Sequence, residues 1–125
     1  MRSLIAAALI TACVPALAQT DWIYLTGDEE ITIYGRAGSI HEVAGLKRAW
    51  FLADRSNSDS IGSRSRVSLN EFNCDTGEWR VLQTTNYKSQ MGKGESLGTD
   101  RKATEWAYVT PGTFNELLIA VVCAS

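Results

Sequence analysis

The sequence predicts an α+β fold: an antiparallel, meander-like sheet of five to seven strands with one C-terminal helix packed on a sheet face. Three observations carry this prediction. Short β-branched and aromatic runs alternate with Gly, Asn, Asp and Ser through most of the chain. The C-terminal segment instead has apolar side chains at helical spacing. Two cysteines remain after an N-terminal export signal, so a disulfide can tie the helix to the sheet.

Residues 1–18 have the three parts of a secretory signal peptide. Arg2 precedes an apolar run, and Ala16-Leu17-Ala18 forms a small-residue cleavage site. We expect cleavage between Ala18 and Gln19. The apolar run holds about a dozen residues, too few for a transmembrane helix, which needs about 20. An alternative is a lipobox, Ile10-Thr11-Ala12-Cys13, in which Cys13 would become the lipid-bearing first residue.

The remaining segment, residues 19–125, has the size of one domain. Removal of residues 1–18 takes away Arg2, which leaves 11 basic and 14 acidic side chains in 107 residues and a net charge of −3. That balance offers no broad attraction to nucleic acid.

We expect an antiparallel order of strands, because no segment between them is long and periodic enough to form a crossover helix. The turn Asp75-Thr76-Gly77-Glu78 supplies a Gly for positive φ. Strands are predicted near residues 22–26, 31–34, 39–43, 47–54, 66–74, 79–88 and 105–110.

Side-chain alternation predicts which strand faces are buried. Within residues 79–87, the odd positions are mainly apolar or aromatic and the even ones, including Arg80, are polar; Leu82 breaks the rule. Residues 49–53 are apolar throughout, which predicts a central strand covered on both faces. Trp50 and Trp106 are therefore expected in the core, whereas Trp22, near the new N-terminus, is expected to be available to a partner.

A helix is predicted over residues 114–123. Thr113 and Glu116 have the spacing of a capping box, in which the Thr hydroxyl accepts from the third helical N–H and Glu116 accepts from the Thr113 N–H. Cys123 falls roughly opposite Phe114 on the helix. Either the last turn unwinds to bring Cys123 to Cys74, or the helix is buried on two sides. The apolar stripe consists of Phe114, Leu117, Leu118, Val121 and Val122.

The two remaining cysteines, Cys74 and Cys123, are predicted to form a disulfide. Their number is even, and the predicted export places them in an oxidising compartment.

At this point an ordered set of motifs resembles a family. In chain order these are Ile33-Tyr34, Ser39-Ile40, Lys47-Arg48-Ala49-Trp50-Phe51-Leu52-Ala53-Asp54, Glu71-Phe72-Asn73-Cys74, Trp106-Ala107-Tyr108-Val109-Thr110-Pro111-Gly112-Thr113, Glu116-Leu117 and Val122-Cys123. The set is similar to the surface-adhesin protein E family of small Gram-negative envelope proteins. The resemblance implies an antiparallel sheet with one disulfide-linked C-terminal helix, and a location in the periplasm or at the outer-membrane surface. It also implies binding of matrix proteins such as laminin and vitronectin by some relatives.

Catalytic and metal-binding signatures are missing from the sequence. His41 is the only histidine, and we interpret it as a strand-surface residue without further metal ligands. No nucleophile-elbow motif and no cofactor motif is present. The segment Gly92–Gly98 is interpreted as a mobile hairpin tip and not as a phosphate loop, and residues 57–65 as a flexible connection.

Basic residues gather on or beside the predicted central strands. If neighbouring strands align Arg48, Arg66 and Arg80, these side chains would form a patch for an anionic glycan or an acidic protein surface. The alternative is scattered charges that pair with nearby acids. The wider basic set is Lys47, Arg48, Arg55, Arg64, Arg66 and Arg80, and the candidate partners are Asp54, Asp59 and Glu71.

The leading hypothesis is a non-catalytic exported protein that binds a matrix protein, an envelope protein or a glycan through a sheet face or loop tips. A rival is a structural or accessory periplasmic protein without a host ligand. A third is a small hydrolase that uses His41. An open sheet edge also offers a route to a homodimer.

Overall fold

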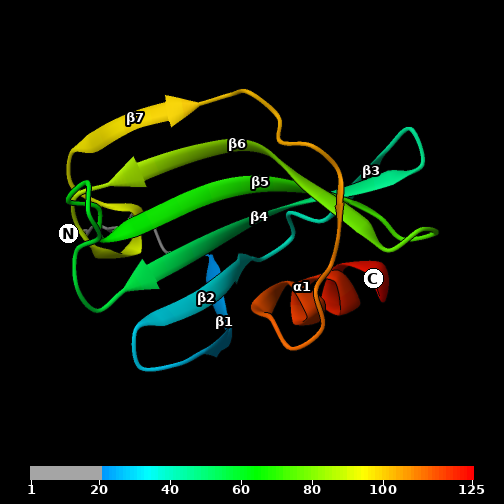
Figure 1. The fold of residues 1–125 in the computed structure, drawn as a ribbon, viewed down its shortest axis with the longest axis horizontal. Coiled ribbons are helices and arrows are strands. Elements are labelled where there is room, and N and C mark those ends of the chain that lie inside the picture. Colours follow the sequence, from blue (N-terminus) through cyan, green and yellow to red (C-terminus); the bar gives the residue numbers. More distant parts are fainter. Residues whose placement is uncertain (1–20) are drawn as a thin grey trace, which may run out of the picture.

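The computed structural model describes residues 21–125; the predicted signal peptide and Cys13 lie outside the described residues. Eight strands and one α-helix follow each other along the chain (Figure 1). A 3-10 turn, η1, covers Gln90–Gly92. The strands are β1 (Trp22–Gly27), β2 (Ile31–Arg36), β3 (His41–Val43), β4 (Leu46–Arg55), β5 (Ser65–Asn73), β6 (Glu78–Tyr87), β7 (Ser96–Asp100) and β8 (Ala107–Tyr108), and the helix is α1 (Phe114–Cys123).

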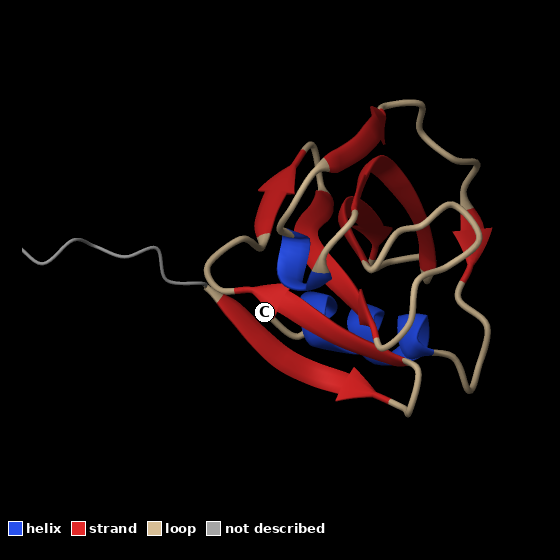
Figure 2. Ribbon diagram, turned by 90° about the vertical axis from the view of Figure 1, so that its left-hand side faces the viewer, coloured by secondary structure: helices blue, strands red, loops and turns tan. Residues whose placement is uncertain are grey.

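All strands belong to one antiparallel sheet, as predicted. The order is β1-β2-β4-β5-β6-β7, with β3 paired to the start of β4 and β8 to the start of β6. β1 and β7 form opposite edges, so the sheet does not close into a barrel. In Figure 2, α1 lies along one side of the curved sheet.

The core lies between the sheet and α1. Register places Ile33, Ala49, Phe51 and Phe72 on the same sheet face, and all four are buried there. We call this side the helix face. Phe51 and Phe72 meet edge to face, with their ring centroids 6.1 Å apart. Leu118 and Val122 of α1 complete the cluster.

The opposite side of the sheet, which we call the open face, carries Tyr34, Arg48, Trp50, Leu52 and Glu71. At one end of the open face, η1 lies on the sheet. Gly92 of η1 is so close that a Cβ added to it would lie 3.4 Å from the Leu52 side chain and 3.3 Å from the Val67 side chain. Leu52 is consequently buried on the open face. The expectation that residues 49–53 are covered on both sides therefore holds for Leu52 but not for Trp50, which is only half-buried.

A β-bulge corrects the predicted alternation in β6. Leu69 pairs with Gln83 and Asn70 pairs with Val81, so Leu82 is the extra residue. The bulge shifts the side-chain parity by one position, which places Arg80 on the same face as Gln83 and Thr85. The prediction that all even positions of β6 share a face is wrong for this reason.

The helix begins as predicted, but its cap differs. The Thr113 hydroxyl donates to the Thr110 carbonyl at 2.6 Å, and Glu116 accepts from the Gly112 N–H at 3.0 Å instead of from Thr113. At the other end the last turn stays wound to Cys123. Cys123 bonds to Cys74, and both Phe114 and Cys123 pack against the core. The predicted disulfide is confirmed, and α1 makes buried contacts on two sides.

Three segments differ from their predicted form. The proposed hairpin tip at Gly92–Gly98 contributes to strand β7, which begins at Ser96, and the strand predicted at 105–110 shrinks to β8. In the connection 57–65, the Asp59 carboxylate accepts the N–H groups of Ile61 and Ser63, so hydrogen bonds organise this loop.

Candidate functional site

A row of polar side chains crosses the open face near the start of β4. His41 pairs with Arg48, Arg48 with Glu71, and Glu71 with Arg80 in successive antiparallel ladders. Directly paired residues share a face, so four strands bring these side chains together. Trp106, just before β8, completes the row because the Arg80 guanidinium lies 4.6 Å from its ring centroid.

The centre of the row is a carboxylate shared by two guanidinium groups. Arg48 Nε donates to Glu71 Oε2 at 2.8 Å, and Arg80 Nε donates to Glu71 Oε1 at 2.9 Å. Arg80 Nη2 lies 2.8 Å from the same Oε1 in an ion pair. The Glu71 side chain is 2% exposed, whereas those of Arg48 and Arg80 are 31% and 29% exposed. The carboxylate is thus a buried anchor beneath two accessible cations.

This arrangement keeps Glu71 ionised. Burial alone would raise the pKa of Glu71, but the hydrogen bonds and positive charges of Arg48 and Arg80 outweigh it and lower the pKa below its ordinary value. The trio therefore carries a net charge of about +1 at neutral pH. Within the described residues, the Nη groups of Arg48 make no hydrogen bond to the protein, so they remain available to an external anion.

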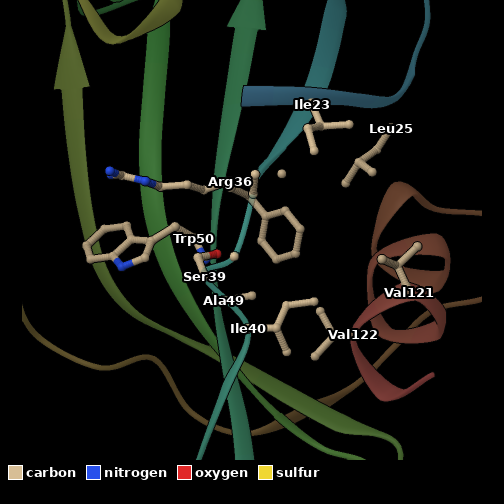
Figure 3. A pocket seen from close by; sticks show the side chains of 13 residues that line it. Ile23, Leu25, Arg36, Ser39, Ile40, Ala49, Trp50, Val121 and Val122 are labelled. Atoms are coloured by element: carbon tan, nitrogen blue, oxygen red, sulfur yellow. The ribbon is translucent and has the colours of Figure 1, made fainter. Parts of the chain in front are cut away.

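A third arginine, Arg36, lies one row away, beside Trp50. Arg36 pairs with Trp22 and follows Gly35, which pairs with Phe51, so Arg36 and Trp50 occupy neighbouring positions on the open face. Figure 3 shows both side chains pointing in the same direction, away from the cavity between β1 and α1. Arg36 also lies 3.5 Å from the Asp21 carboxylate.

Between these rows the surface is hollowed. A polar depression of about 380 Å³ is lined by Asp21, Arg36, Ser39, His41 and Trp50, together with the backbone around Gly38. The Ser39 Oγ accepts the Trp50 N–H at 3.2 Å, and the Ser39 carbonyl lies 3.0 Å from His41 Nδ1. The β2–β3 connection thus contacts the His41 ring and the Trp50 backbone, and both residues line the depression.

A separate apolar cavity of about 200 Å³ opens on the helix face between β1 and α1 (Figure 3). Ile23 and Leu25 enter it from β1, and Val121 and Val122 from α1. The Arg36 side chain is directed away from it (Figure 3). This cavity can accept an apolar group, but it contributes no charge to binding.

The structure brings together only part of the predicted basic patch. Arg48 and Arg80 converge on Glu71, one of the predicted partners. Arg66 is opposite Ala53 and bonds to Asn86 Oδ1 at 3.1 Å, so it lies on the helix side of the sheet. Its inclusion in the patch is wrong because residues an odd number of positions apart point to opposite faces of a strand.

Other sequence-based expectations concern single residues. His41 is an exposed strand residue, as predicted, and the described residues contain no cluster of three metal-ligating side chains. Trp50 and Trp106 are half-buried and not core residues, and Trp22 is half-buried too. Sequence reasoning missed Arg36 as a site residue, although its even spacing from Tyr34 places both on one strand face.

The family model of surface-adhesin protein E matches residues 22–124. Two structures of Haemophilus influenzae protein E, crystal form II and the selenomethionine form, are 16% identical to this chain, with TM-scores of 0.68 and 0.67. They match over 93% and 89% of this chain and 97% and 92% of theirs. No curated protein sequence matches the chain.

A third structure, protein E from non-typeable Haemophilus influenzae, has a TM-score of 0.59 at 16% identity, over 92% of this chain and 83% of that one. These likenesses establish a protein E-like fold. The family points to a non-enzymatic, exported and envelope-associated adhesin. No helix in the described residues is long and apolar enough to span a membrane. The match over residues 22–124 places the chain in the surface-adhesin protein E family.

Proposed function

We propose that this protein is a non-catalytic binding protein of the bacterial envelope whose ligand docks on the open face of the sheet. The observation that carries the proposal is the pair Arg48 and Arg80, held over the buried Glu71 carboxylate with Trp106 against Arg80. Preformed guanidinium groups on a rigid sheet lose little freedom when they bind, which favours recognition. Residues 1–18 act as the export signal in this proposal.

Binding to matrix proteins tests the adhesive form of this proposal. The processed protein, purified after export, is expected to bind immobilised laminin or vitronectin saturably. The double variant Arg36→Gln/Arg48→Gln should bind more weakly, because it removes two cations from the open face. A variant with Arg66→Gln, on the other face, serves as the matched control. If neither matrix protein binds saturably, the proposal that this protein is an adhesin is rejected.

Location distinguishes this proposal from a periplasmic accessory role. Protease added to intact cells should degrade the protein if it is displayed at the surface. Complete protection in intact cells, with degradation after the outer membrane is permeabilised, would place it in the periplasm. A periplasmic protein with no host ligand would then be the better account.

A further inference from the structure

We infer that the open face binds an acidic polysaccharide, with a sugar ring against the Trp50 indole and the anionic substituents on Arg36 and Arg48. This inference rests on the proposed function and names the class of ligand. Its starting observation is the polar depression that Arg36, His41 and Trp50 line together. Arg48 extends the depression because it pairs directly with His41.

Charge is the first argument. The chain without residues 1–18 carries a net charge of −3, yet Arg36, Arg48 and Arg80 gather around the depression and the Glu71 carboxylate against two acids, Asp21 and Glu71. Two other acids lie toward the ends of the open face: Asp54 accepts the Met91 N–H at η1, and Glu78 pairs with Tyr108 of β8. The group of three arginines and two carboxylates therefore has a net charge of about +1, which complements a polyanion.

Geometry is the second argument. A guanidinium group presents paired N–H donors that fit a carboxylate or sulfate group, and the Arg48 Nη groups have no partner within residues 21–125. An indole beside such a group offers a flat apolar surface for the C–H groups of a sugar ring. The combination occurs twice on this face, as Arg36 beside Trp50 and as Arg80 against Trp106.

The polar depression of this face is better suited to a polysaccharide than to an inserted apolar side chain of a protein. Protein interfaces gain much of their affinity from a few anchors, among them Trp, Tyr and Arg, that are fully desolvated in well-packed pockets. The depression on the open face is lined mainly by polar groups, and the apolar cavity near Val121 lies on the helix face. A polysaccharide needs no such anchor, because it can lie across the side chains of the open face.

The test compares heparin with chemically desulfated heparin and with a single-stranded oligonucleotide of similar charge, by isothermal titration at low ionic strength. We expect heparin to bind the processed protein more tightly than either of the other probes. Arg36→Gln should weaken heparin binding about fivefold, through the loss of one exposed charge-assisted contact. Trp50→Phe should weaken it about threefold or more, because the stacking surface shrinks.

Arg66→Gln is the matched control, since it removes the same charge from the other face and should change the dissociation constant by less than about twofold. Equal losses in the Arg36 and Arg66 variants would overturn the inference, as would no effect of Arg36→Gln, no heparin binding, or equally tight oligonucleotide binding. If laminin or vitronectin still binds through the open face when heparin does not, the proposed function stands and the polysaccharide ligand is rejected. Thermal melting of each variant checks that it is folded.

Discussion

The shared carboxylate of Glu71 should be the most sensitive position on the open face. The substitution Glu71→Gln keeps the shape of the side chain but removes the charge between Arg48 and Arg80. Its amide has one acceptor oxygen, so the guanidinium that faces the NH2 group loses its partner. A hydrogen bond to a charged group contributes about 1.5–3 kcal/mol, and breaking a buried ion pair costs about 3–5 kcal/mol.

The destabilisation by Glu71→Gln should be at the lower end of this range, because Arg48 and Arg80 are about 30% exposed and water can solvate them. We therefore expect Glu71→Gln to lower the free energy of unfolding by about 3 kcal/mol and Tm by about 12 °C. Urea denaturation followed by tryptophan fluorescence measures the change. Glu95→Gln is the control, since the exposed Glu95 lies 3.6 Å from Lys88 Nζ and should contribute less than about 0.5 kcal/mol. A loss below about 0.5 kcal/mol for Glu71→Gln would refute this account of the trio.

Wild type and Glu71→Gln also test whether folding lowers the pKa of Glu71. Because folding lowers the pKa of Glu71, the ionised carboxylate stabilises the native state fully above its unfolded value, near 4.5, and this contribution is lost as the pH falls through the folded pKa. The stability difference between wild type and Glu71→Gln should therefore narrow below about pH 4.5. A difference that stays constant between pH 7 and pH 3 would mean that folding leaves the pKa unchanged.

Three further predictions concern the scaffold, each measured by urea denaturation. The disulfide between Cys74 and Cys123 spans 49 residues, so replacing both cysteines with Ser should cost about 4 kcal/mol, and a loss below about 1 kcal/mol would contradict it. Leu118→Ala should cost about 2–4 kcal/mol because the side chain is 5% exposed, whereas Leu117→Ala, at 38% exposed, should cost less than half as much. Gly92→Ala should cost more than about 1 kcal/mol, because Gly92 has φ +69° and packs η1 onto the open face; an unchanged midpoint would argue against that packing.

Local sequence pattern was sufficient for much of the scaffold. The spacing of apolar residues located α1, the turn at Gly77 located the β5–β6 hairpin, and the cysteine count indicated the disulfide. These features depend on neighbours within a few residues or on a simple count, so no register was needed. A strand was predicted at residues 105–110, but its reduction to the two residues of β8 could not be predicted, because this short pairing depends on where the chain returns to β6.

The candidate site depended on strand register, which local pattern does not specify. Arg48, Glu71 and Arg80 lie on three strands, and only the pairing of those strands places both guanidinium groups on one carboxylate. The bulge at Leu82 then sets the face of Arg80, while strict alternation along β5 sends Arg66 to the other side.

The composition and ordering of residues thus predicted a disulfide-linked sheet-and-helix domain and its family resemblance. Which side of the sheet remained open, and which charges met there, came from long-range packing. The helix can cover one face only, and its aliphatic stripe selects the side with Phe51 and Phe72. The side chains of Arg36, Arg48, Trp50 and Arg80 then point to the open face, because neighbouring side chains on a strand alternate between its two sides.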